Sequence, residues 1–117
     1  MSTQAAWKPA GLTYARSITA SQVNATTPTG FAGGGPVARV YNAGTVAVMV
    51  AFYVNANGAP TLAFPVDAAP PVGEPGTLVP PGTTVFVDGV AAADSFAAIG
   101  AAAGPSLIYV QKGDGNS

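Results

Sequence analysis

The longest apolar run of the chain, residues 46–54, alternates between two sets of side chains. Its even-numbered positions read Val, Val, Val, Phe and Val, and its odd-numbered positions read Ala, Met, Ala and Tyr. Successive side chains of a β-strand point to opposite faces, so this pattern predicts a strand whose large, β-branched face fills a core. The other face lacks the polar residues of a solvated strand. Either the strand is central with both faces covered, or its outer face, with Met49 and Tyr53, contacts a neighbouring subunit.

Several other segments have the composition of short strands and are bounded by Gly, Pro or Asn. We predict these strands at residues 12–19, 37–41, 62–66, 83–88 and 106–111. The Asn and Gly within residues 42–45 predict that the strands on either side of this turn form a β-hairpin. In the strand at 83–88, Val85 and Val87 are expected on one face and Phe86 on the other.

Residues 90–104 fit two different structures. Their Ala content, with Asp94 as an N-terminal cap and Gly104-Pro105 as a stop signal, is compatible with a helix. Residues 96–100 are equally compatible with a strand. We favour the strand because the segment lies between two strongly predicted strands.

The chain divides into an N-terminal arm and one domain. Residues 1–36 are rich in Ser, Thr, Gln, Ala and Gly and end in a Gly-Gly-Gly-Pro joint, which predicts an extended arm containing at most an edge strand at 12–19. Residues 37–117 predict the domain, with a long proline-rich loop at 60–81 because each proline removes a backbone donor. Six to eight short antiparallel strands separated by Gly and Pro indicate an all-β fold, a β-sandwich or jelly-roll-like module.

The chain carries very little charge for a soluble protein. Only 8% of its 117 residues are charged, against about 25% in an average domain. A surface so poor in charge favours an assembly in which other protein covers much of it; the alternative is a monomer exposing Ser, Thr, Asn and Gly. The four basic residues are scattered, so we expect no nucleic-acid partner, and no apolar stretch is long enough to predict a membrane span.

Few side chains could carry chemistry. The sequence has no Cys and no His, which removes thiolate catalysis and the usual zinc and copper ligands. None of its acidic residues is closely spaced with another; they are Asp67, Glu74, Asp88, Asp94 and Asp114. The glycines of residues 30–35 lack the Lys-Ser/Thr of a phosphate-binding loop. We therefore expect no enzymatic activity, no cofactor and no metal site. Residues 1–7 lack the pattern of a secretory signal, so synthesis in a cytoplasm is expected.

Three segments resemble small structural proteins of tailed bacteriophages, most of all capsid decoration (cement) proteins. They read RVYNAGTVAV at 39–48, PPGTTVF at 80–86 and SLIYV at 106–110, the last followed by Gly-Asp-Gly, and the resemblance covers residues 37–115. It implies a β-sandwich or jelly-roll module on the capsid exterior of a virion, bridging subunits of the major capsid protein and contacting copies of itself as a homo-oligomer. The family offers no catalytic or cofactor-binding residue to carry over.

Under this resemblance, contacts with the shell or with sister subunits are expected in the arm, the proline-rich loop and the outer face of the strand at 46–54. The candidate interface residues are Trp7, Lys8, Pro9, Met49, Tyr53, Pro70 and Pro71. Trp7 is the only tryptophan, a residue type that often dominates interface energy, although it could equally pack on its own sandwich.

Two other functions are compatible with the sequence. The chain could be a tail-fibre or receptor-binding domain that recognises a host glycan, because glycan sites combine aromatic side chains with amide or acidic ones, and Tyr53, Asn55 and Asn57 supply such a set. It could also be a minor head–tail component.

Overall fold

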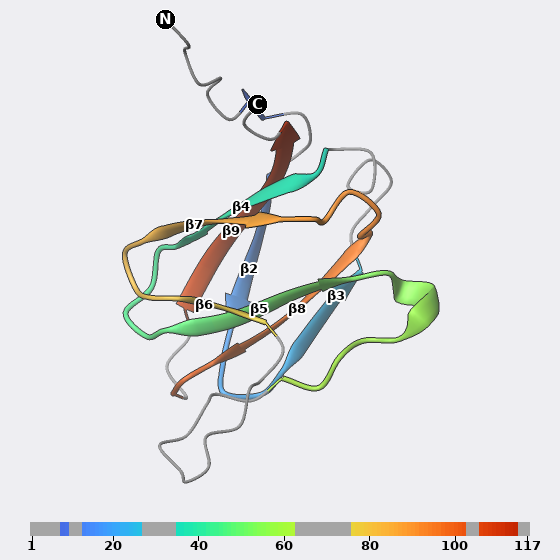
Figure 1. The fold of residues 1–117 in the computed structure, drawn as a ribbon. Coiled ribbons are helices and arrows are strands. Elements are labelled where there is room, and N and C mark those ends of the chain that lie inside the picture. The colour runs from blue at the N-terminus through green and yellow to red at the C-terminus, as the bar shows by residue number, and fades with distance from the viewer. Residues whose placement is uncertain (1–7, 10–12, 27–34, 63–75, 103–105, 115–117) are drawn as a thin grey trace, which may run out of the picture.

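The computed structural model describes residues 8–9, 13–26, 35–62, 76–102 and 106–114. Nine strands in this part of the chain form two antiparallel sheets that pack face to face (Figure 1). The first sheet, sheet A, contains β1 (Lys8–Pro9), β2 (Tyr14–Ile18), β9 (Ser106–Asp114), β4 (Val37–Asn42) and β7 (Thr84–Asp88). The second, sheet B, contains β3 (Val23–Thr26), β8 (Ser95–Gly100), β5 (Val48–Tyr53) and β6 (Thr77–Val79). The predicted all-β sandwich is confirmed.

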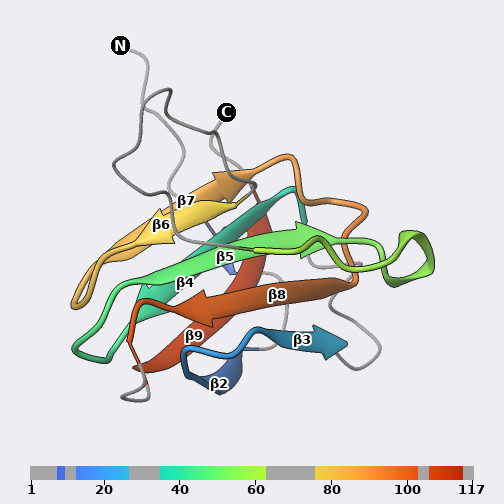
Figure 2. The same ribbon diagram turned by 90° about the horizontal axis from the view of Figure 1, so that it is seen from below.

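The strand order is that of a jelly roll. Sheet A has the order β2-β9-β4-β7, with the two-residue β1 beside β2 on the same edge of β9, and sheet B has the order β3-β8-β5-β6. Along the chain the strands therefore cross repeatedly from one sheet to the other, as in two interleaved Greek keys. Figure 2 shows β3, β8 and β5 side by side in sheet B with sheet A behind them.

The core lies between the sheets and is built from alternate residues of each strand, as a period of two requires. The fully or almost fully buried members of the main cluster are Ile18, Val40, Val48, Val50, Val79, Phe96, Ala98, Ile108 and Val110. Phe52 packs against Phe96 with 6.2 Å between ring centroids. The β-branched face predicted for residues 46–54 thus fills the core through Val48, Val50 and Phe52.

Part of the predicted arm belongs to the sandwich. The expected edge strand at 12–19 is present as β2, which pairs with Ser106–Val110 of β9, and its Ile18 is buried in the core. A second strand, β3, was not predicted and pairs with β8. The boundary at residue 36 therefore does not separate an arm from the domain, because residues 14–26 contribute a strand to each sheet. Residues 1–7 and the glycines at 33 and 34 lie outside the described residues.

The predicted hairpin between residues 37 and 55 is wrong. β4 pairs with β7 and β9, whereas β5 pairs with β6 and β8 in the other sheet. The buried side chain of Asn42 holds the connection instead: its Nδ2 donates to the carbonyl oxygens of Val46 (2.8 Å) and Val79 (3.0 Å), and its Oδ1 accepts from the Gly44 N–H (2.9 Å). Asn-x-Gly therefore turns the chain from one sheet to the other rather than back along its own strand.

The proline-rich loop predicted at 60–81 contains a strand. β6 lies at the edge of sheet B, where Pro80 and Pro81 after it leave the ladder undisturbed, and it pairs only with Val48–Val50 of β5. The backbone at Gly76 has φ +112°, a conformation that ends β6 on its N-terminal side. Of the strand predicted at 62–66, only Leu62 lies within the described residues, and it is not in a strand.

The other strand predictions are confirmed. Residues 95–100 form β8 rather than a helix, and β7 directs Val85 and Val87 toward the core and leaves Phe86 exposed. β9 continues past the predicted end at 111 to Asp114. Within the described residues, no helix has the length and apolar character needed to cross a membrane.

Candidate functional sites

Exposed aromatic side chains gather on the outer face of sheet A. Tyr41 is 39% exposed, Tyr109 37% and Phe86 52%. Their neighbours in sequence, Val40, Val110, Val85 and Val87, pack on the core, so the three rings must point outward. Three of the four large hydrophobic side chains exposed in the described part of the chain therefore lie on one surface, which we term the aromatic face.

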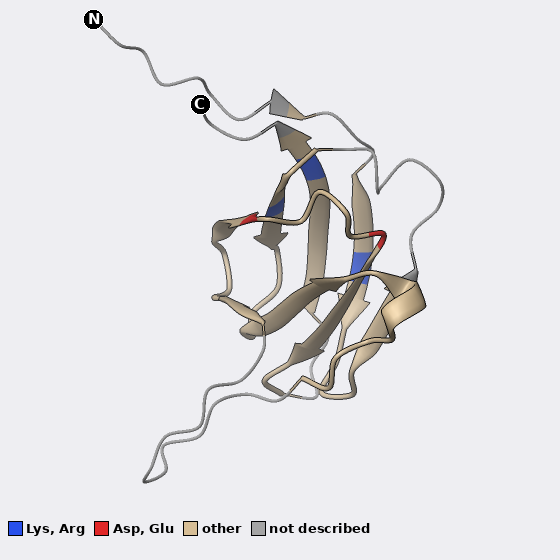
Figure 3. Cartoon of the chain, turned by 45° about the vertical axis from the view of Figure 1, so that its right-hand side comes forward, with Lys and Arg blue, Asp and Glu red and all other residues tan. Residues whose placement is uncertain are grey.

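The aromatic face carries two stacked rings and little charge. Tyr41 and Tyr109 lie opposite each other in the ladder between β4 and β9, and their rings are stacked with centroids 6.3 Å apart and planes inclined by 19°. Arg39 lies in the next row, opposite Phe86 and Gln111, and its Nη2 donates to Gln111 Oε1 at 3.1 Å. The charged residues of the described structure are few and scattered (Figure 3).

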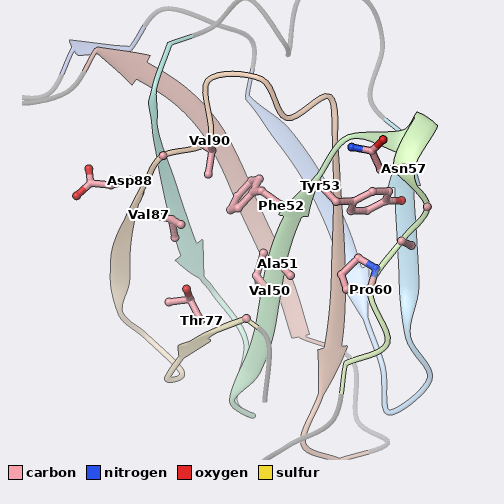
Figure 4. A pocket seen from close by; sticks show the side chains of 14 residues that line it. Val50, Ala51, Phe52, Tyr53, Asn57, Pro60, Thr77, Val87, Asp88 and Val90 are labelled. Atoms are coloured by element: carbon pink, nitrogen blue, oxygen red, sulfur yellow. The ribbon is translucent and has the colours of Figure 1, made fainter. Parts of the chain in front are cut away.

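A second feature is a cleft of about 660 Å³ beside β5, at the point where β6 begins. On one side it is lined by Phe52, Val87 and Val90, which face the interior of the sandwich (Figure 4). Tyr53 points to the opposite side of β5, toward the 3₁₀ turn η1 (Asn55–Asn57), and Asn57 and Pro60 line the cleft there. The carboxylate of Asp88 points away from the cleft (Figure 4).

Asp94 connects two segments beside the cleft, the connection from β7 to β8 and the segment that runs from β5 into η1. Its Oδ1 accepts hydrogen bonds from the Asn55 N–H (2.8 Å) and from Ser95 Oγ (3.1 Å), and its own N–H donates to the Tyr53 carbonyl (3.3 Å). Because these bonds join the end of β5, the start of η1 and the connection from β7 to β8, the turn that carries Asn57 is held against the sandwich.

Lys112 is buried inside the sandwich, close to Asp94. Its side chain is fully inaccessible to solvent, and its Nζ donates to the carbonyl oxygens of Ala93 (2.8 Å) and Ala91 (3.2 Å). Desolvation by burial lowers the pKa of Lys112, and the nearby charge of Asp94 opposes part of that effect. The lysine therefore holds β9 against the connection from β7 to β8, which lines the cleft at Val90. Its place in the polar C-terminal segment did not suggest this role.

Gln22 holds the segment after η1, which lines the cleft at Pro60. Its Nε2 donates to the Pro60 carbonyl and its Oε1 accepts from the Leu62 N–H, both at 2.7 Å. Leu62 and Met49 are both 4% exposed, and their side chains lie close to Gly76. The chain that follows η1 is thus fastened to sheet B.

Replacing Gln22 by Ala is expected to loosen this fastening without unfolding the sandwich. The variant loses two hydrogen bonds to a partly buried backbone, which should lower stability by about 1–2 kcal/mol and speed hydrogen exchange of the Leu62 amide. Ser21→Ala, which shortens a neighbouring exposed side chain and leaves both bonds of Gln22 to the backbone in place, is the control. Equal protection of Leu62 in both variants, measured by exchange NMR, would contradict the role given to Gln22.

The structure separates the interface residues predicted from sequence. Met49 lies on the outer side of β5 but is covered, so it offers no surface to a partner. Tyr53 lines the cleft, and the proposed glycan residue Asn57 joins it there, whereas the Asn55 backbone is held by Asp94. Pro9 is exposed in β1, and Lys8 is the other residue of that strand. Trp7, Pro70 and Pro71 lie outside the described residues.

Sequence reasoning missed the aromatic face. The signal was present, because each of its aromatic residues is adjacent in sequence to a valine within a correctly predicted strand and so has to lie on the face opposite to the core. What was lacking was the knowledge that β4, β7 and β9 are neighbours in one sheet.

No family model matches the chain, and no curated protein or solved structure shows significant similarity to it. In the described ranges, no group of three or more acidic residues is placed to hold a metal ion.

Proposed function

We propose that the chain is a structural virion protein that decorates a phage capsid on its outside and stabilises it by bridging subunits of the major capsid protein. The observation that carries the proposal is the aromatic face. Tyr and Phe are enriched in the centres of protein interfaces, and Arg39 in the adjoining row is of the residue type that most often accompanies them. A sheet face with exposed aromatic rings and little charge suits contact with another folded surface.

The charge content of the chain supports the same proposal. With 8% charged residues, a large part of the surface gains little from hydration, so covering it is favourable. A protein that binds only the assembled shell stabilises that shell by mass action, and many copies multiply a modest interface energy. Sister copies bound side by side would account for the remaining uncharged surface.

Replacing both Tyr41 and Tyr109 by Ala tests the proposal. The double variant should bind shells of the major capsid protein at least about 30-fold more weakly, because truncating a central aromatic residue commonly costs 2 kcal/mol or more. The measurement is co-sedimentation with shells that lack the protein, at several concentrations of each variant.

Leu78→Ala is the matched control, because Leu78 is 46% exposed but lies on β6 at the edge of the other sheet. Both variants should melt as cooperatively as the wild type. Unchanged shell binding by the double variant would overturn the use of the aromatic face. Recovery of the wild-type protein with isolated tails, and not with shells, would replace the capsid role by a head–tail one.

A further inference from the structure

We propose that the cleft beside β5 binds a neutral saccharide through Tyr53 and Asn57. The inference goes beyond the shell role and does not depend on it, because none of the three rings of the aromatic face, Tyr41, Phe86 and Tyr109, lines the cleft. Its volume, about 660 Å³, lies within the range of small-ligand sites in proteins.

The charge of the cleft restricts the ligand. None of the described lining residues is Lys or Arg, so a phosphate or carboxylate group would find no charge-assisted partner. The one carboxylate among them, on Asp88, points away from the cleft (Figure 4), which leaves no counter-charge for a cationic ligand either. An uncharged ligand is therefore favoured.

The side chains of the cleft match the two kinds of surface that a sugar presents. Tyr53 offers an aromatic ring with a polar tip, suited to the C–H face of a pyranose. Asn57 can donate and accept, as can the hydroxyl of Thr77 at the start of β6, and sugar hydroxyl groups do the same. Phe52, Val87 and Val90 form the apolar part of the cleft, on the other side of β5 from Tyr53 (Figure 4).

The polar end of the cleft is preorganised. Asp94 fixes the carbonyl of Tyr53 and the N–H of Asn55, the first residue of η1, and Gln22 fixes the backbone at Pro60 and Leu62. The turn that presents Asn57 is therefore held at both of its ends. A site held in this way loses less conformational entropy when a ligand binds.

Titration by ¹⁵N–¹H correlation NMR with maltotriose, cellotriose and triacetylchitotriose tests the inference. We expect at least one of these neutral trisaccharides to shift the amide signals of Asn57, Gly58 and Gly89 with a dissociation constant on the order of 1 mM. Tyr53→Ala and Asn57→Ala should each weaken that binding about 10-fold or more. Asn57 is exposed in a turn, so its replacement leaves the fold intact even if Tyr53→Ala does not.

Tyr109→Ala is the control, because Tyr109 lies on the aromatic face and does not line the cleft; its affinity should equal that of the wild type. Absence of shifts with all three sugars, or binding that Asn57→Ala leaves unchanged, would overturn the inference. So would stronger binding of glucuronic acid, or of an extended Ala-Val peptide, than of any neutral sugar. None of these results bears on the capsid, so the saccharide site and the shell role can fail separately.

Discussion

Replacing Gly44 by Ala is expected to lower the free energy of unfolding by about 3 kcal/mol or more. A Cβ atom at this position would overlap Ser106 Oγ and would lie 2.5 Å from both Cα and Cβ of Ser106. Ser106 is fully buried at the start of β9, and its Oγ both accepts from the Val46 N–H (3.2 Å) and donates to the Val46 carbonyl (3.0 Å). An added Cβ at Gly44 would therefore force the start of β9, in sheet A, away from the connection that leads into β5 of sheet B.

Gly58→Ala separates this steric effect from backbone strain. Gly58 has φ +85° but nothing within 4 Å of an added Cβ, whereas the conformation at Gly44 is an ordinary one and only space is lacking. The Gly58 variant should lose about 2 kcal/mol, because φ +85° with ψ 150° is a conformation that is essentially restricted to glycine. Urea denaturation of both variants gives the comparison; a loss at Gly44 no larger than that at Gly58 would refute the close approach of Ser106.

The Asn42–Gly44 connection also shows why strand identity was easier to predict than strand pairing. The alternation of Val with small or aromatic residues identified β5, β7 and β9 because a two-residue period is a local property. Whether Asn-Ala-Gly reverses the chain or carries it to the other sheet depends on the hydrogen bonds of Asn42 to Val46 and Val79, and Val79 is 37 residues away. A local turn signal cannot contain that information.

The same difference between local patterns and long-range contacts applies to the candidate sites. Tyr53 and Asn57 are four residues apart, and the sequence offered them, with Asn55, as a possible glycan-binding set, but the cleft that Tyr53 and Asn57 line was not predicted. The aromatic face needs residues 41, 86 and 109 in one sheet, which only the jelly-roll order provides. β3 escaped prediction because Val-Asn-Ala-Thr is short and half polar, and it is stabilised as a strand by its pairing with β8 rather than by its own composition.

Lys112 is the residue whose place the sequence concealed most completely, and Lys112→Met is expected to lower stability at neutral pH by about 3 kcal/mol. Methionine keeps most of the apolar stem but leaves the carbonyl oxygens of Ala91 and Ala93 without their charged donor, and a hydrogen bond to a charged group contributes about 1.5–3 kcal/mol. The cost of burying the ammonium offsets part of two such bonds. Arg16→Met, which removes an exposed positive charge from β2, should change stability by no more than about 0.5 kcal/mol.

The stability difference between the wild type and Lys112→Met should also grow with pH in the alkaline range. Because the pKa of Lys112 is lowered by folding, the unfolded chain binds more protons than the folded one between the folded pKa and the ordinary value of 10.5. Stability rises with pH wherever the unfolded state binds more protons, so the wild type gains in this window and the Met variant does not. A difference in unfolding free energy that stays constant or shrinks from pH 8 to pH 10.5 would show that burial does not dominate the environment of this lysine.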